Sequence, residues 1–153
     1  MSRLTRFLNF FRVNKSIAID LGTSNVLIYD KQKNKIVLNE PSVIVKNRKT
    51  GELVAVGKEA KEMEGKTAES TVFIRPLTEG VISDIDATRE MLSAFIRQIY
   101  GGSPFRPELM VCVPIEMTSI EKKAIFDAAI GAKKIYLLEE GEYELLSIAK
   151  ENY

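Results

Sequence analysis

A short polar turn between two apolar segments carries the residues of this chain best suited to chemistry. An acid, Asp20, precedes the small and polar residues Gly22-Thr23-Ser24-Asn25, and apolar segments flank them within residues 17–29. Small residues allow backbone N–H groups to converge on one concave space, which suits a phosphate. A carboxylate repels phosphate, so the acid fits such a site when a hydrated Mg²⁺ lies between the two. The alternative is an ordinary β-hairpin turn that contains Gly and Asn, and these four residues alone leave both interpretations open.

The composition excludes several other kinds of site. The chain has 153 residues, of which 45% are hydrophobic and 28% charged, with a formal net charge of +1. These values are typical of one soluble globular domain, or one lobe of a larger protein, and give no general signal for nucleic acid. Histidine is absent and Cys112 is the only cysteine, which excludes internal disulfides, Cys/His zinc sites and His-based catalytic pairs. We expect Cys112 to be buried, the compartment to be a reducing cytoplasm, and no segment to span a membrane.

The first residues have a composition of their own. Residues 1–15 contain no acid and four cations, namely Arg3, Arg6, Arg12 and Lys15. Helical spacing places Leu4, Phe7, Leu8 and Phe11 on one face, with the arginines mostly elsewhere. This pattern predicts an amphipathic helix over residues 1–14 that lies in the surface of an anionic membrane, with weak, reversible binding that assembly would strengthen. A helix packed on its own domain is the alternative, whereas a secretory signal peptide needs a longer apolar core and a cleavage site.

The hydrophobic pattern along the rest of the chain predicts an α/β or α+β domain with a mixed sheet. Strands are expected at 16–21, 26–31, 35–38, 43–46, 53–56, 109–113 and 135–138, with a further apolar segment at 71–74. Pro41 is expected to block continuation of the third strand. Helices are expected at 57–64, from Asp84 or Asp86 to Tyr100, from Thr118 to Ile130, and at 142–150. Asp84 or Asp86 can cap the second of these, and Thr118 with Glu121 forms a capping box by spacing.

Several motifs together resemble one family. Ile19-Asp20-Leu21-Gly22-Thr23-Ser24-Asn25 is similar to the first phosphate loop of actin-fold ATPases. Residues 38–43, 56–60 and 74–84 look like the MreB family of bacterial actins, and the likeness continues through Val113-Pro114-Ile115, Thr118 with Glu121, and Leu138-Glu139-Glu140. Each motif is weak alone, but their order along residues 17–140 is specific. Members of that family often begin with an amphipathic membrane helix, which residues 1–12 resemble.

The resemblance implies a fold and its division into parts. It implies an actin-like ATPase domain of the ribonuclease H-like class, a mixed sheet with flanking helices and an inserted small α+β subdomain, with the second actin-like domain absent. The first subdomain would comprise residues 15–36 and 75–153, and the inserted subdomain residues 37–74, after the membrane helix at 1–14.

The resemblance also implies a site and partners. Asp20 would face hydrated Mg²⁺, while Gly22, Thr23, Ser24 and Asn25 would contact the phosphates of ATP. Glu140, with Glu139 beside it, would orient the attacking water, although a solvated acidic pair that opens a helix is the simpler interpretation from the residues alone. The family implies self-association or MreB-like filaments at the cytoplasmic inner face of an anionic cell membrane, where they organise cell-wall synthesis and rod shape, with no nucleic acid involved.

Some features depart from the family. MreB chains are much longer, and their second phosphate loop, adenosine pocket and second connecting helix are not in this sequence. The family's proline after the second glutamate is Gly141 here, and bulky residues replace the alanine-rich crossing helix at 142–149. We therefore expect an MreB-like rod shape-determining protein, here a truncated N-terminal half deficient in ATP hydrolysis. The alternatives are a non-enzymatic membrane- and filament-binding module, a degraded product, and another actin-fold ATPase, against which residues 75–84 and the basic start argue.

Overall fold

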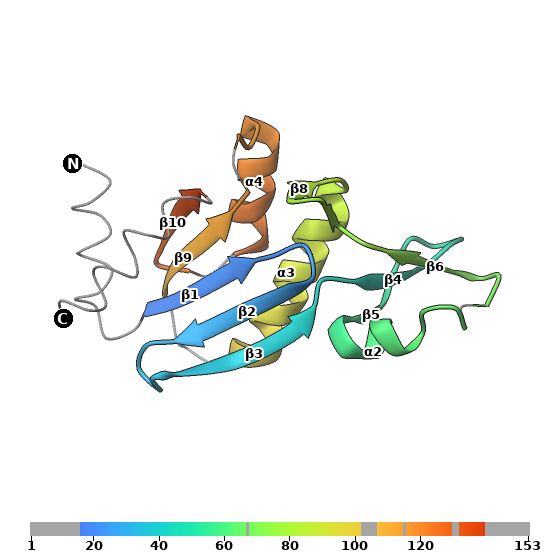
Figure 1. Ribbon diagram of the computed structural model, residues 1–153, viewed down its shortest axis with the longest axis horizontal. Coiled ribbons are helices and arrows are strands. Elements are labelled where there is room, and N and C mark those ends of the chain that lie inside the picture. Colours follow the sequence, from blue (N-terminus) through green and yellow to red (C-terminus); the bar gives the residue numbers. More distant parts are fainter. Residues whose placement is uncertain (1–15, 67, 102–106, 115, 130–131, 140–153) are drawn as a thin grey trace.

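A five-stranded mixed sheet forms the centre of the larger part of the molecule (Figure 1). The structure, a computed structural model, describes residues 16–66, 68–101, 107–114, 116–129 and 132–139. The sheet has the order β10-β9-β1-β2-β3, in which β1, β9 and β10 are parallel and β2 is antiparallel to both its neighbours. The strands are β1 (Ser16–Leu21), β2 (Asn25–Asp30), β3 (Lys35–Pro41), β9 (Glu108–Val113) and β10 (Lys134–Glu139). The mixed sheet of the predicted actin-like class is therefore confirmed.

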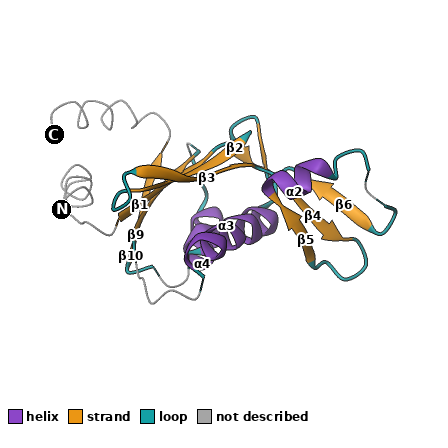
Figure 2. Ribbon diagram, turned by 90° about the horizontal axis from the view of Figure 1, so that it is seen from below, coloured by secondary structure: helices purple, strands orange, loops and turns teal. Residues whose placement is uncertain are grey.

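Two helices cover one face of this sheet (Figure 2). They are α3 (Ile85–Tyr100) and α4 (Ser119–Ala128), and their apolar residues join those of β1, β2 and β9 in one core cluster. The predicted caps are confirmed. The Asp84 carboxylate accepts from Ala87 N at 2.9 Å, and Thr118 and Glu121 exchange both hydrogen bonds of a capping box. Every residue of β9 is buried, as expected for the apolar segment that includes Cys112.

A small antiparallel sheet lies beyond the end of β3, with its own short helix. It has the order β5-β4-β6, from β4 (Ile44–Asn47), β5 (Leu53–Val56) and β6 (Thr71–Ile74), and α2 (Gly57–Glu62) packs on it. Val43, Val45, Ala55 and Ala60 form a second core cluster that is separate from the first. The small α+β unit is therefore present as expected, while the predicted boundaries of the subdomains remain a prediction.

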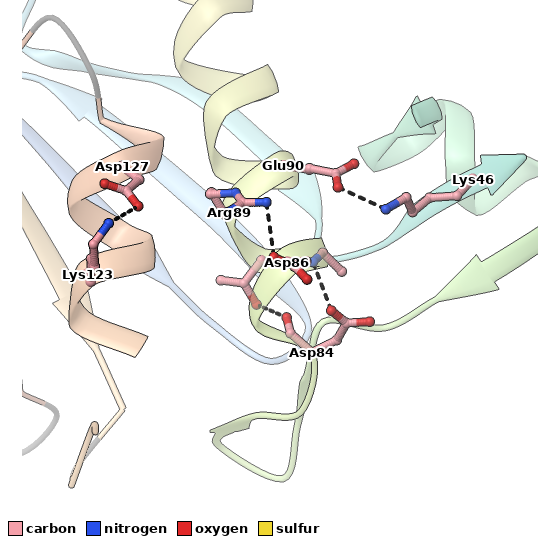
Figure 3. Close-up of polar contacts among 9 residues, drawn as sticks. Lys46, Asp84, Asp86, Arg89, Glu90, Lys123 and Asp127 are labelled. Atoms are coloured by element: carbon pink, nitrogen blue, oxygen red, sulfur yellow. Dashed lines mark hydrogen bonds and ion pairs between the residues drawn. The ribbon is translucent and has the colours of Figure 1, made fainter. Parts of the chain in front are cut away.

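One ion pair links the small sheet to α3 (Figure 3). Lys46 Nζ on β4 lies 2.8 Å from Glu90 Oε1, and the two side chains are 18% and 28% exposed. Ile44, also on β4, belongs to the core cluster of the large sheet. Figure 3 also shows Arg89 paired with Asp86 on α3 itself. Apolar packing and a half-buried ion pair thus hold the two sheets in a fixed relation.

Two details differ from the sequence-based expectation. The third strand was expected to end at residue 38, but β3 continues to Pro41, because an edge strand tolerates a proline whose missing N–H would face away from its partner. The sequence analysis also missed a two-stranded hairpin made of β7 (Leu77–Thr78) and β8 (Val81–Ile82). Its turn places Glu79 at φ 51° and Gly80 at φ 77°. Two consecutive positive φ values match the tight turn that hairpins favour, but glutamate rarely occupies the first position.

A buried carboxylate fastens the end of α3 to the turn after β2. Asp30 is 3% exposed, and its Oδ2 accepts from the Tyr100 hydroxyl at 3.1 Å. Its Oδ1 accepts from Lys33 N at 3.1 Å. Burial raises the pKa of Tyr100, and the Asp30 charge raises it further, so the hydroxyl stays protonated and remains a donor.

We expect Tyr100→Phe to lower the free energy of unfolding by about 1–3 kcal/mol, because a buried charged acceptor loses one donor. Urea denaturation followed by circular dichroism at neutral pH measures this loss. Tyr29→Phe is the matched control, since the Tyr29 hydroxyl donates to Asn34 in an exposed position and its loss should cost less than about 0.5 kcal/mol. Equal losses in the two variants would contradict the special role of Asp30.

Candidate functional site

The polar turn at residues 22–25 lies at the edge where the parallel strands end. In the register of the sheet, Asp20 on β1 pairs with Cys112 on β9, and Leu138 on β10 pairs with the same Cys112. The carboxyl ends of three parallel strands therefore meet beside the turn. Ligands of open α/β sheets bind at this kind of edge.

Hydrogen bonds from a buried serine hold the turn in place. Ser42, which is 0% exposed, donates its hydroxyl to Gly22 O at 2.6 Å and its backbone N–H to Ser24 O at 2.9 Å. Gly22 N donates to Asn25 O at 3.1 Å across the turn. Ser42 directly follows β3, so the same residues that lead to the small sheet fix the shape of the turn.

The missed hairpin β7–β8 also touches the turn. Gly80 N donates to Thr23 Oγ1 at 2.9 Å, although the two residues are 57 positions apart. Because an amide can only donate, Thr23 Oγ1 is the acceptor and its own proton remains available to a ligand. Sequence analysis singled out neither Ser42 nor Gly80 as a site residue. The only signal for them was their presence within the family-like segments at 38–43 and 74–84.

The turn offers several hydrogen-bond donors to solvent. Thr23 and Ser24 are exposed, and within the described ranges the backbone N–H groups of both residues and the Ser24 hydroxyl have no acceptor. Two adjacent amides and two hydroxyls form a donor set that fits a phosphate. The Asn25 side chain, by contrast, already makes a hydrogen bond within the protein, because its Nδ2 donates to Asn39 Oδ1 at 2.7 Å. Its predicted phosphate contact remains a prediction.

The acids near the turn fit a cation held mostly by water. Asp20 is exposed at the end of β1, and Glu139, the last residue of β10, is half-buried. In the part of the chain that the structure describes, no group of three or more acidic or cysteine side chains could enclose a metal ion. One carboxylate together with water and phosphate oxygens is a common way to bind Mg²⁺. The residues present therefore fit the predicted role of Asp20.

Two parts of the expected machinery lie outside the described residues. They are Glu140, with the altered segment at 141–149, and the predicted membrane segment at 1–14 with Leu4, Phe7, Leu8, Phe11, Arg3, Arg6 and Arg12. Among the described residues, no helix has the length and apolarity needed to cross a bilayer. The predicted roles of these two segments remain predictions.

Comparison with known proteins identifies relatives along most of the chain. A family model described as MreB/Mbl protein matches residues 14–144. The cell shape-determining protein Mbl of Bacillus cereus is 49% identical over 129 residues, which cover 82% of this chain and 38% of that protein. The chain thus spans about two fifths of the length of this curated relative.

Solved structures agree with the sequence relatives. A crystal structure of MreB5 of Spiroplasma citri bound to ADP aligns with a TM-score of 0.70 at 33% identity, over 86% of this chain and 40% of that one. A second structure of that protein, bound to AMPPNP, aligns with a TM-score of 0.70 at 32% identity, over 88% and 41% of the two chains. The fold is therefore the first part of the actin-like fold, and the chain belongs to the MreB/Mbl family.

Proposed function

We propose that this chain acts as an MreB-like cell-shape protein whose turn at residues 22–25 binds the phosphates of Mg-ATP. The observation that carries the proposal is the donor set of Thr23 and Ser24, presented beside Asp20 where β1, β9 and β10 end. The nucleotides bound to MreB5 of Spiroplasma citri, a diphosphate and a triphosphate analogue, support the choice of ligand.

Each residue of the turn has a role in this proposal. The amides of Thr23 and Ser24 and their hydroxyls donate to phosphate oxygens, Gly22 and Asn25 shape the turn, and Asp20 holds Mg²⁺ through water. Mg²⁺ neutralises the charge that would otherwise separate carboxylate from phosphate. Thr23 Oγ1 keeps its bond from Gly80 N while it donates its proton, and such a chain of bonds strengthens each member.

The finer parts of the function also belong to the proposal. We propose cytoplasmic filaments at the inner face of the membrane, attached through residues 1–14, that help to organise cell-wall synthesis. The division into residues 15–36 with 75–153, and an inserted 37–74, also belongs to the proposal. The separate core cluster of Val43, Val45, Ala55 and Ala60 supports an inserted unit, although Leu38 and Ile44 pack into the core of the large sheet. Hydrolysis by this chain is weak, because Glu140 is followed by Gly141 instead of the proline that would fix the backbone. Misplacement of a catalytic group by about 1 Å can cost a hundredfold in rate.

Titration of the ¹⁵N-labelled 153-residue chain with Mg-ATP, followed by amide chemical shifts, tests the proposal. We expect the amides of Thr23, Ser24 and Gly80 to shift together, with a dissociation constant of about 1 mM or weaker, because the residues of this chain surround only part of the nucleotide. A phosphate-release assay on the same sample should show no turnover above background. Asp20→Ala should remove the dependence of the shifts on Mg²⁺.

Lys49→Gln, an exposed change on the turn between β4 and β5, is the control and should titrate like the unmodified chain. Shifts that are scattered over the surface, or equal with and without Mg²⁺, would contradict the phosphate site. Micromolar affinity that Asp20→Ala abolishes would contradict the weak binding and indicate that the chain completes the site, for instance by dimerising.

A further inference from the structure

The edge of the large sheet where the parallel strands begin carries a row of lysines. Lys35, the first residue of β3, pairs with Asp30 at the end of β2, and Lys31 and Lys33 lie in the turn between them. Lys134, the first residue of β10, pairs with Glu108, which pairs with Ser16 of β1. We call Lys31, Lys33, Lys35, Lys133 and Lys134 the lysine edge. Five strands at a spacing of about 4.8 Å make this edge roughly 19 Å wide.

The carboxylates of this edge are buried, whereas four of its five lysines are exposed to solvent. Asp30 is 3% exposed and Glu108 is 5% exposed. By contrast, Lys33, Lys35, Lys133 and Lys134 are exposed, and only Lys31 is half-buried. The Lys33 ammonium lies 4.0 Å from Asp30 Oδ2, at the limit of an ion pair. The surface of the edge is therefore strongly positive, although the whole chain has a net charge of only +1.

The opposite edge has the opposite sign. Asp20 and Glu139 lie at the ends of β1 and β10, and Glu116 lies in the segment after β9. Glu79 lies in the β7–β8 turn, next to the Gly80 amide that contacts Thr23. The chain thus carries its cations at one end of the strands and acids around the candidate nucleotide site at the other. A charged surface would orient such a molecule as well as attract it.

We propose that the lysine edge is a second membrane contact, which lies against anionic lipid headgroups and turns the candidate nucleotide edge away from the bilayer. This inference rests on the proposed membrane attachment through residues 1–14. That segment joins the sheet at Ser16, on the lysine edge itself, where Lys31 N donates to Ser16 O at 3.0 Å. The segment adds Arg3, Arg6, Arg12 and Lys15 and no acid.

A lipid surface fits this row better than a protein or nucleic acid partner. The ammonium groups sit on flexible side chains across a width of several headgroups, an arrangement that suits many mobile anionic headgroups better than one rigid ligand. An apolar segment continues directly from the same edge, and a bilayer is the partner that accepts cations and apolar rings together. Each lysine near an anionic leaflet raises the partition coefficient by about fivefold.

Vesicle cosedimentation with the full chain tests the proposal, on phosphatidylcholine vesicles containing 30% phosphatidylglycerol in about 0.1 M salt. We expect the triple variant Lys33→Gln, Lys35→Gln, Lys134→Gln to bind at least about tenfold more weakly than the unmodified chain. The matched control is Lys49→Gln, Lys58→Gln, Lys66→Gln. It removes the same charge from three exposed lysines on the turn, helix and following segment of the small unit, and should lose less than about threefold. Circular dichroism and the urea midpoint confirm that both variants fold.

Each of the other possible results of this assay would overturn the inference. Equal losses in the two triple variants would show an effect of net charge alone and overturn the inference. Unchanged binding by the lysine-edge variant would overturn the inference and leave attachment through residues 1–14 standing. An unmodified chain that fails to bind would overturn both, and so would a preference for duplex DNA over the vesicles in the same buffer.

The orientation has a separate readout. A fluorophore is attached at Gln32→Cys on the lysine edge or at Glu79→Cys near the candidate site, each combined with Cys112→Ala. We expect brominated lipids to quench the label at position 32 and to leave the label at position 79 unquenched. Equal quenching at both positions would overturn the proposed orientation.

Discussion

Alanine at Gly22 is expected to lower the free energy of unfolding by about 1–3 kcal/mol and to remove the amide shifts induced by Mg-ATP. A Cβ at this position would lie 2.6 Å from Asn25 O, closer than such atoms approach in proteins. That oxygen belongs to the backbone and also accepts the Gly22 N–H across the turn. It cannot move easily, because the Asn25 side chain is bonded to Asn39 and β2 begins there. The turn must therefore open, and its donors would lose their common direction.

Two further variants separate steric crowding at Gly22 from backbone strain and from the loss of a single donor. Gly51→Ala also adds a methyl group to a turn, but no atom lies within 4 Å, so only the positive φ of 73° carries a cost, of about 1 kcal/mol. It should leave the nucleotide shifts unchanged. Ser24→Ala removes an exposed hydroxyl and should weaken nucleotide binding without changing stability. Urea denaturation and the amide titration measure both quantities. If Gly22→Ala unfolded at the same free energy as the unmodified chain and showed the same amide shifts with Mg-ATP, the turn would not need its tight geometry.

The elements that the sequence predicted well are those with a strong local signal. The hairpin β1–β2, the buried strand β9 and the caps at Asp84 and Thr118 each follow from periodicity or from a side chain three residues from its partner. The hairpin β7–β8 gave no such signal, because two-residue strands are too short to show alternation. The turn residue Glu79 also gave no signal, because hairpin turns with a positive φ at this position usually have Asn, Asp or Gly there.

The position of the candidate turn was predictable from the sequence, but the hydrogen bonds that support it were not. Small residues after an acid indicated a turn at 22–25, either a phosphate turn or an ordinary hairpin turn, and the structure has a turn there between β1 and β2. Binding of phosphate by this turn stays a prediction. Its geometry depends on Ser42 and Gly80, which lie 20 and 57 positions from their partners. Hydrogen bonds across such separations leave no periodicity in one sequence. The charge separation between the strand ends was hidden for a related reason, since net charge and composition do not record position in the fold.

The largest effect on membrane binding is expected from Phe7→Glu with Phe11→Glu. Both residues lie on the predicted apolar face of residues 1–14, with Leu4 and Leu8. Withdrawal of each ring from the bilayer surface loses about 1.5–3 kcal/mol, so the pair should lower the partition coefficient by at least about a hundredfold. Vesicle cosedimentation with anionic lipid measures the change.

The matched control, Ser2→Glu with Asn9→Glu, adds the same two charges. On a helix with about 100° per residue, both positions lie nearly opposite the apolar face, where they would point to water. We expect this control to lose only the attraction of two charges, about fivefold each. Equal losses in the two variants would mean that charge alone attracts the segment, and the predicted insertion of its aromatic face would be wrong. A large difference would show that the rings enter the bilayer. Filament assembly could then multiply one weak helix into firm attachment, because every added subunit contributes another anchor at a high effective concentration.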